Sequence, residues 1–308
     1  MRNDGAFVSV FVEEYSERTS CITHSGVFHA DEVLGTVILE EAFGDITVAR
    51  VSEVPTDLPD SIIVYDIGRG KFDHHQPGGN GRRENGVAYA SAGLLWKAFG
   101  DKVVEGSADP GYLWAYVDES LIQGVDAADN GDIPTTNDMN RVFSFTKMIA
   151  GFNPEWDNEK IFDQAFLEAV EFAKTVFDNV ITRGNALIKA KGIVERAIWE
   201  TAGQIMVLEK PVPWKDALLE SDYPHANDIL FVIYPSERGG YVWQGVPDEL
   251  GSYGQRKMVP DNWRGLSGDE LRKATGVPTA VFCHQKGFAG SAETLEDAIL
   301  FAAKAIET

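Results

Sequence analysis

The chain has 308 residues, of which 44% are hydrophobic and 24% are charged, and this composition excludes a disordered, collagen-like or disulfide-rich protein. Its 48 acidic residues outnumber the 27 basic ones and give a net charge of −21, the opposite sign from a protein that coats nucleic acid. The length predicts about two domains.

Short apolar runs alternate with helical stretches over the first 130 residues, a pattern typical of βαβ units and a mainly parallel sheet. We predict strands at 20–23, 46–51 and 62–65, and helices at 32–43 and 88–99. Functional groups of such folds collect at the carboxyl ends of the strands. We therefore expect a site in the segments that follow the first and third of these strands.

Residues 101–180 are strongly acidic, with 16 acidic and 5 basic side chains that supply about half of the net charge. The stretch is predicted to be helical, with solvated acidic faces. Residues 158–202 repeat apolar positions with a helical period and predict one or two long helices. We place the domain boundary near their end, which gives domains at 1–200 and 201–308.

Strands return after this region, at 228–234, 241–246 and 279–283, and a helix at 292–306 closes the chain. Gly239-Gly240 between the first two strands predicts a hairpin. The expected fold class is therefore α/β: an N-terminal domain with a mainly parallel sheet, a smaller α+β C-terminal domain, and a cleft between them.

The first candidate site motif combines His24, His29 and Asp31, three polar side chains within eight residues that connect a strand to a helix. Imidazole and carboxylate together are a ligand set for zinc, manganese or iron. The structural alternative is that His24 satisfies a buried backbone group and Asp31 caps the helix.

A second motif, Asp73-His74-His75, lies in a glycine-rich loop after Asp66, which follows the third strand. One imidazole of the pair can bind a metal ion while the other contacts a substrate oxygen, and Asp73 can fix a tautomer from behind. The alternative is a polar loop without a ligand, and Asp66 alone fits a turn residue equally well.

This loop is also locally basic, because residues 69–83 contain four basic residues and only one acidic residue. The basic residues are Arg69, Lys71, Arg82 and Arg83. Such a positive segment in an acidic protein predicts an anionic ligand, with Arg82 and Arg83 as candidate substrate contacts. Exposed basic side chains that serve solubility are the alternative.

Asp126 and Asp129 lie three residues apart, hence on one helical face, just before an Asn-Gly helix stop. Taken alone, the pair is better explained by helix termination than by a site. Together the motifs supply about six metal ligands, enough for two divalent ions that share a carboxylate. These are His24, His29, Asp31, Asp66, His74 and one of Asp126 or Asp129. Two such ions suit the hydrolysis of a phosphoester.

The motifs resemble the melanocyte-proliferating-gene family of metal-dependent hydrolases, within the DHH phosphoesterase superfamily. The resemblance runs through nearly the whole chain. It is carried by THSGVFHADE at 23–32, YDIG at 65–68, FDHHQ at 72–76, VDAADNG at 125–131, GYVWQGVP at 240–247 and FCHQKGF at 282–288.

The resemblance implies a two-domain phosphoesterase with Mn²⁺ or Mg²⁺ ions in the cleft. His24 and His29 would bind one ion, Asp31 and His74 would bind the other, and Asp66 would bridge them. Asp126 or Asp129 would complete the second site, and His75 would contact the scissile phosphate. His29 departs from the wider superfamily, in which many members carry an aspartate at this position.

The superfamily's C-terminal domain typically offers a glycine-rich, basic surface to the substrate. The residues that fit this role here are Arg238, Gly239, Gly240, His284, Lys286 and Gly287. The Gly287–Gly290 loop, which we expect at the N-terminus of the last helix, is a candidate anion site, with a plain strand-to-helix turn as the alternative.

The resemblance implies a metal-dependent phosphodiesterase, with 3′–5′ exonuclease activity on RNA or short oligonucleotides through metal-activated water. One alternative is a hydrolase of small phosphoanhydrides or nucleotides, since one metal site serves several phosphoesters. Another is a non-catalytic nucleotide-binding regulator. The acidic N-terminus and the lack of a long apolar run predict a cytoplasmic protein without membrane contact.

Overall fold

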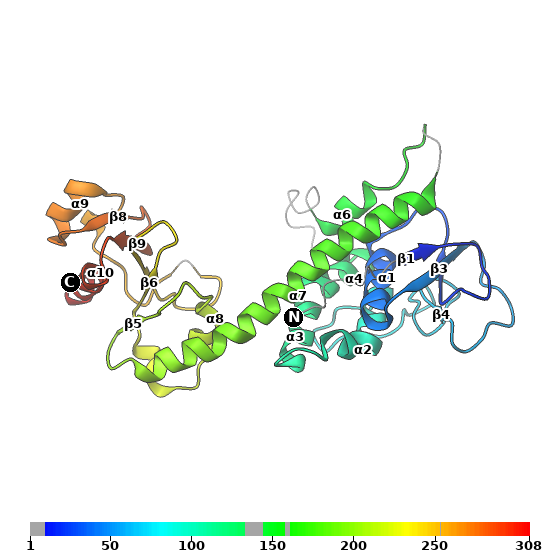
Figure 1. Cartoon of the computed structure of the whole chain (residues 1–308), viewed down its shortest axis with the longest axis horizontal. Coiled ribbons are helices and arrows are strands. Elements are labelled where there is room, and N and C mark those ends of the chain that lie inside the picture. Colours follow the sequence, from blue (N-terminus) through cyan, green and yellow to red (C-terminus); the bar gives the residue numbers. More distant parts are fainter. Residues whose placement is uncertain (1–9, 133–143, 158–160, 253) are drawn as a thin grey trace. The chain divides into compact units, whose positions relative to one another are not determined.

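The computed structural model describes residues 10–132, 144–157, 161–252 and 254–308. The chain divides into two compact units, Met1–Asn185 and Ala186–Thr308. The division falls within α7 (Phe162–Glu200), the long helix in Figure 1, so the periodic region after residue 161 is one helix and not two. The roles predicted for the two domains, and the cleft between them, stay predictions.

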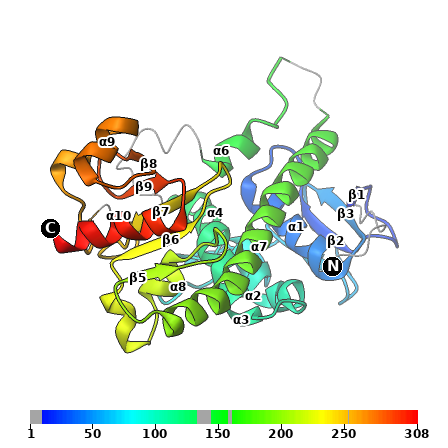
Figure 2. The same ribbon diagram turned by 60° about the vertical axis from the view of Figure 1, so that its left-hand side comes forward.

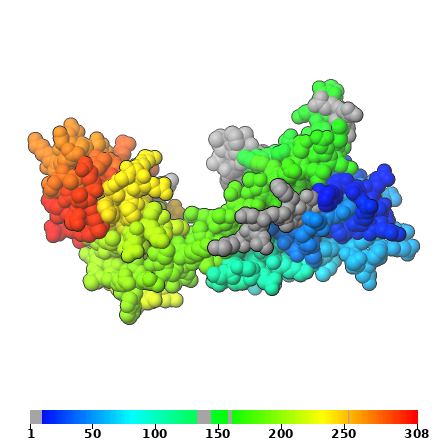
Figure 3. Space-filling model, viewed as in Figure 1, coloured from blue at the N-terminus to red at the C-terminus, as the bar shows by residue number. Residues whose placement is uncertain are grey.

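The N-terminal unit contains a four-stranded sheet in which every pair is parallel, as the sequence predicts. Its strand order is β1-β3-β2-β4, formed by β1 (Val10–Val12), β2 (Cys21–His24), β3 (Ile46–Val51) and β4 (Ile63–Val64). β1 is an edge strand, and Figure 3 shows the first described residues, in dark blue, at the surface of this unit.

Two helices that pack on each other position the site. α1 (Ala30–Phe43) is buried at every residue from 30 to 40, and these buried residues include the polar Asp31, Glu32, Thr36 and Glu40. α1 packs on α2 (Ser91–Val104), and Gly35 permits the close approach. A Cβ atom at Gly35 would lie 2.9 Å from Leu95 Cδ1.

The acidic region is mostly helical where it is described, with turns at 105–109 and 151–157, and residues 133–143 and 158–160 lie outside the described residues. α3 (Pro110–Val117) begins with proline after Asp109, whose carboxylate accepts the Tyr112 N–H. A π-helical segment, Asp118–Ile122, joins α3 to α4 (Gln123–Asp129). α6 (Phe145–Ala150) precedes α7.

The C-terminal unit contains a mixed five-stranded sheet in the order β5-β6-β7-β9-β8. Only β5 and β6 pair in parallel, and Pro235 pairs with Tyr241 across the predicted Gly239-Gly240 hairpin. The strands are β5 (Ile205–Val207), β6 (Phe231–Pro235), β7 (Tyr241–Gly245), β8 (Ala280–Cys283) and β9 (Ala289–Ala292).

Helix α10 (Leu295–Glu307) lies along this sheet (Figure 2) and packs Phe301 onto Trp243, with ring centroids 4.6 Å apart. The stacked pair forms the centre of an apolar cluster that also contains Trp263. The remaining short helices are α8 (Lys215–Leu219), α9 (Gly268–Thr275) and two 3₁₀ turns, Pro224–Asp228 and Asp261–Trp263.

Strand β9 was not predicted, and it corrects one expectation. Gly287 lies in the turn between β8 and β9, and β9 separates this turn from α10, so the predicted anion site at the start of the last helix is wrong. The sequence Ala-Gly-Ser-Ala lacks the branched and aromatic residues that mark strands. Gly290 is required there because a Cβ atom would lie 2.3 Å from Trp243 Cζ2.

The two cysteines are free thiols, and both are buried. Burial raises the pKa of Cys21 to about 12 and that of Cys283 to about 11. Because the thiolate is the reactive form, we expect iodoacetamide at pH 8 to label the native protein very slowly and the denatured protein within minutes. Mass spectrometry of the labelled chain measures both rates, and fast labelling of the native protein would contradict the buried positions.

Candidate metal centre

Neighbouring parallel strands bring His24 and Asp66 together. β2 and β4 pair through Cys21–Ile63 and Ile22–Val64, and each side chain follows two residues after the second pair. His24 Nε2 lies 3.4 Å from Asp66 Oδ2. Asp66 has a φ of 56°, in the left-handed region that aspartate tolerates better than most residues. Strand register therefore places the two residues that the sequence predicted at strand ends.

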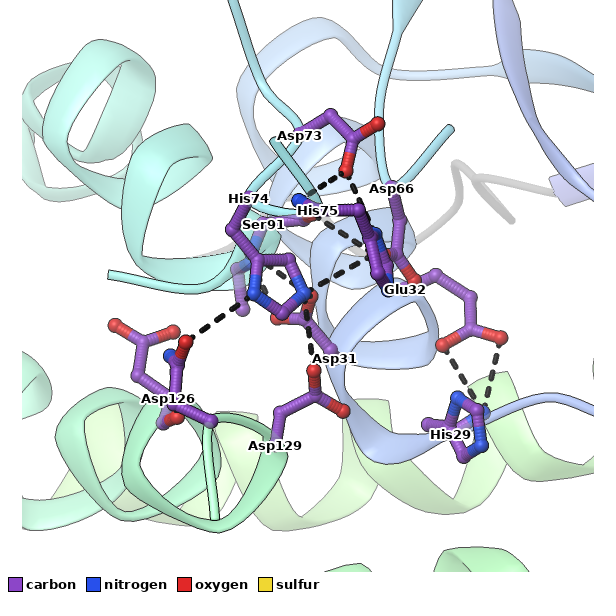
Figure 4. Close-up of polar contacts among 12 residues, drawn as sticks. His29, Asp31, Glu32, Asp66, Asp73, His74, His75, Ser91, Asp126 and Asp129 are labelled. Carbon is purple, nitrogen blue, oxygen red and sulfur yellow. Dashed lines mark hydrogen bonds and ion pairs between the residues drawn. The ribbon is translucent and has the colours of Figure 1, made fainter. Parts of the chain in front are cut away.

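His74 lies close to the carboxylates of Asp31, Asp66 and Asp129, as Figure 4 shows. Its Nε2 lies 3.0 Å from Asp129 Oδ2, 3.5 Å from Asp66 Oδ1 and 3.7 Å from Asp31 Oδ2. Its Nδ1 lies 3.3 Å from Asn130 Oδ1. A proton on Nδ1 would be held by this amide oxygen, which leaves Nε2 as the metal-binding atom.

The N-terminus of α2 holds Asp31 in place. The Ser91 N–H donates to Asp31 Oδ2 at 2.8 Å, and the Ala92 N–H donates to Oδ1 at 2.7 Å. Ser91 Oγ also donates to Asp66 Oδ1 at 3.1 Å. Free N–H groups at a helix start favour an anion, but burial and the nearby carboxylates of Asp66 and Asp129 still raise the pKa of Asp31 well above its usual value.

A further cluster contains His24, His29 and Glu32, whose ligand atoms all lie within 4.8 Å of one another. Glu32 Oε1 lies 2.9 Å from His24 Nε2, and the His29 N–H donates to both Glu32 oxygens at 2.9 and 3.0 Å. Glu32 belongs to the first motif but is not among the ligands that the sequence predicts. Its position three residues after His29 already indicates a capping box.

The spacing of these atoms fits divalent ions. With metal–ligand distances of about 2.1 Å, ligand atoms on one ion lie about 3.0 Å apart in an octahedron and about 3.4 Å apart in a tetrahedron. The contacts of His24 and His74 span 2.9 to 3.7 Å. Among the described residues, the buried His74 Nε2 has no well-aligned hydrogen-bond partner. Asp66 turns one oxygen to each histidine, as a bridging ligand would.

When no cation is bound, the two histidines of the site hold protons instead. Burial opposes a charged His24, but its contacts with Asp66 and Glu32 raise its pKa to about 10. Burial likewise opposes a charged His74, but Asp129 and Asp66 raise its pKa to about 11. Burial would raise the pKa of Asp66, but His24 and His74 hold it below its usual range.

These shifts predict that Mn²⁺ binding releases protons. Both histidines are protonated at neutral pH in the metal-free chain, because their pKa values lie near 10 and 11. Each must lose its proton to bind a cation, so the affinity for Mn²⁺ should rise as the pH increases from 6 to 9. Titration calorimetry in two buffers of different ionisation enthalpy measures the release, and an affinity independent of pH would contradict it.

Asp73 orients His75, the second histidine of the triplet. Asp73 Oδ1 accepts the His75 backbone N–H at 3.0 Å and lies 2.7 Å from His75 Nδ1. The Arg69 N–H donates to Oδ2 at 2.6 Å. Burial opposes charge on Asp73, but these hydrogen bonds lower its pKa below the usual value. With Nδ1 engaged, Nε2 of the half-exposed His75 ring is the atom available to a ligand.

The structure separates the two aspartates of the fourth motif. Asp129 reaches His74, whereas the fully buried Asp126 lies 2.7 Å from Arg83 and accepts the Gly93 N–H at 3.0 Å. Arg83 also makes two hydrogen bonds to Asp118, at 2.6 and 2.9 Å. This geometry favours Asp129 over Asp126 as the candidate ligand, and it engages Arg83 with two buried carboxylates. The spacing of the two aspartates in the sequence does not predict this difference, because the contact of Asp126 with Arg83 forms only when distant segments of the chain pack together.

The other predicted substrate residues lie in three places. Arg82 is exposed and donates to the Gly86 carbonyl oxygen at 2.9 Å. An open groove of about 700 Å³ in the C-terminal unit is lined by Arg238, Gly239 and Gly240 together with Tyr234 and Phe282. The remaining three, His284, Lys286 and Gly287, follow β8 and are not part of the groove lining.

Fold and site define a class of protein: an α/β protein with a candidate two-metal centre at the carboxyl ends of parallel strands. The chain belongs to the family described as "Uncharacterised protein family (UPF0160)", whose MYG1_exonuc model matches residues 20–306. Together with the relatives, this match confirms the family resemblance. Within the described residues, no helix combines the length and the apolar character needed to cross a membrane.

Several relatives cover nearly the whole chain. The MYG1 protein of Saccharomyces cerevisiae is 32% identical over 89% of this chain and 91% of its own length. The MYG1 exonuclease of Homo sapiens is 30% identical over 91% and 84%. A solved structure of RecJ with Mg²⁺ from Thermus thermophilus matches 92% of this chain and 48% of that chain, at 14% identity and a TM-score of 0.26.

Proposed function

We propose that the chain is a metal-dependent phosphodiesterase of the DHH type that removes nucleotides from the 3′ ends of RNA or short oligonucleotides. The observation that carries this proposal is Asp66, whose two oxygens face the histidines of two different clusters. Two divalent ions that share a carboxylate suit the displacement of an oxygen at phosphorus. The names of the human and bovine relatives, both MYG1 exonuclease, support the same activity.

The proposed roles follow from the contacts. His24 and His29 would hold the first ion, His74, Asp31 and Asp129 would hold the second, and Asp66 would contribute to both. When bound, Mn²⁺ or Mg²⁺ ions lower the pKa of water and stabilise negative charge on the attacking and leaving oxygens. His75, whose Nδ1 is held by Asp73, is the proposed contact to a phosphate oxygen through its Nε2. The α2 N-terminus keeps Asp31 aligned.

The charge distribution favours a short substrate. A net charge of −21 repels a long polyanion, and cations at the acidic centre reverse this effect locally. Arg82 and the groove at Arg238–Gly240 are the proposed contacts for the rest of the substrate, with the turn at His284, Lys286 and Gly287 as a further contact. Two buried free thiols fit a reducing compartment, so we propose a cytoplasmic protein.

Comparison of substrates tests the proposal. We expect the Mn²⁺-loaded protein to release mononucleotides from a 5′-labelled RNA of about ten nucleotides, and the His74→Ala variant to serve as the blank. Dinucleotides, the same RNA with a blocked 3′ end, and pyrophosphate complete the set. Preference for pyrophosphate would favour the phosphoanhydride alternative. Tight nucleotide binding without turnover of any substrate would favour the non-catalytic regulator.

A further inference from the structure

We propose that Glu32 is a ligand of the first metal ion, where it completes a set formed by His24, His29 and one oxygen of Asp66. The inference rests on the proposed two-metal function and adds a residue to it. Glu32 is fully buried in the third position of α1, and Figure 4 shows it beside His29, on the opposite side of Asp66 from Asp129.

The tautomer of His24 supports this role. His24 Nδ1 lies 3.2 Å from the Ser25 carbonyl oxygen, which can only accept a hydrogen bond, so Nδ1 carries a proton. In the neutral ring Nε2 then presents a lone pair. This lone pair faces Glu32 Oε1 at 2.9 Å and Asp66 Oδ2 at 3.4 Å. In the metal-free chain a proton on Nε2 lies among these three electron-rich atoms, and a bound cation would take the place of that proton.

The number of carboxylates in each cluster also supports a role for Glu32 as a ligand. The second cluster has two carboxylates of its own, Asp31 and Asp129, in addition to Asp66. Without Glu32, the ligands of a doubly charged ion in the first cluster would be the neutral imidazoles of His24 and His29 and one oxygen of Asp66. Burial of an ionised carboxylate is unfavourable unless a positive charge accompanies it. Glu32 beside His24 supplies the negative charge, and the ion supplies its partner.

Capping of α1 does not by itself account for Glu32. The carboxylate accepts the His29 N–H with both oxygens, as in a capping box. A neutral glutamine serves such a box equally well. The contact of Oε1 with His24 Nε2 lies outside the box and joins Glu32 to the metal-binding atom. Replacement by glutamine therefore retains an acceptor for the cap and removes the charge.

The test is calorimetric titration of the full chain with Mn²⁺. We expect the wild-type protein to bind two ions and the Glu32→Gln variant to bind one of them at least about 10-fold more weakly, with the other unchanged. Asp129→Asn should weaken the other ion, and the double variant should weaken both. Glu40→Gln is the matched control, because Glu40 is also buried on α1 but pairs with Lys174.

Two results separate the possible failures. Unchanged affinities at both sites in folded Glu32→Gln would overturn the role of Glu32 and leave the proposed function standing. A wild-type protein that binds no divalent ion would overturn both. If thermal melting shows that Glu32→Gln does not fold, Glu32→Asp replaces it, since the shorter side chain withdraws the carboxylate from His24. Unchanged affinity in that variant would also contradict the proposal.

Discussion

Replacement of Asp66 by asparagine should lower kcat for metal-dependent hydrolysis by about 1,000-fold or more. Asp66 is the carboxylate whose oxygens face both His24 and His74. The loss of its charge weakens both proposed ions together, and stabilisation of the transition state by metal ions is worth several kcal/mol, where about 1.4 kcal/mol corresponds to a factor of ten. Asparagine suits the test because it tolerates the left-handed backbone at φ 56°.

Asp57→Asn is the matched control for this substitution. Asp57 is exposed and has a φ of 62°, so the same chemical change occurs in the same backbone conformation away from the site. We expect wild-type kcat and metal binding for this control. Saturating Mn²⁺ should not rescue Asp66→Asn. Activity within tenfold of wild type in a folded Asp66→Asn protein would show that Asp66 does not bridge two catalytic ions.

Replacement of Arg83 by methionine should lower the free energy of unfolding by about 3–5 kcal/mol, because it leaves two buried carboxylates without their partner. The side chain of Arg83 is 7% exposed and contacts Asp118, also 7% exposed, and Asp126, which is fully buried. Urea unfolding monitored by circular dichroism measures the change. Arg82→Met provides the comparison, since the neighbouring arginine is 62% exposed and its loss should be nearly neutral.

The loss at Arg83 should also depend on pH. Burial raises the pKa of Asp126 to about 6, although Arg83 opposes this shift. Because the folded-state pKa lies above the unfolded one, stability is lost as the pH rises through the folded value. Without Arg83 the folded pKa rises further, so the deficit should be larger at pH 8 than at pH 5. A deficit that shrinks toward pH 8 would argue against the buried ion pair.

Strand periodicity predicts the location of much of the metal centre. His24 ends β2 and Asp66 follows β4, as expected for the carboxyl ends of parallel strands, and Asp31 lies at the start of α1. Each of these residues lies next to a strand or helix that the sequence predicts. Their backbone positions follow from the parallel register of β2 and β4, which form from short apolar runs that the sequence shows directly.

Partners from distant segments could not be predicted in this way. The N–H groups of Ser91 and Ala92 hold Asp31 across 60 and 61 residues, and Asn130 reaches His74 across 56. No periodicity within a segment encodes such contacts, because tertiary packing creates them, for Asp31 the packing of α2 on α1. Strand β9 could not be predicted from local sequence either, because its small residues form a strand by pairing with β7 and β8.

The sequence by itself indicated the parallel α/β class through its short apolar runs and helical periods, and its histidine and aspartate motifs indicated the family through their resemblance to it. Only the tertiary structure decided between Asp126 and Asp129, which lie on the same helical face. Asp126 enters the buried pocket of Arg83 and Gly93, while Asp129 reaches His74. The physical reason is that helical spacing fixes a shared face, whereas packing between helices selects the partner of each carboxylate.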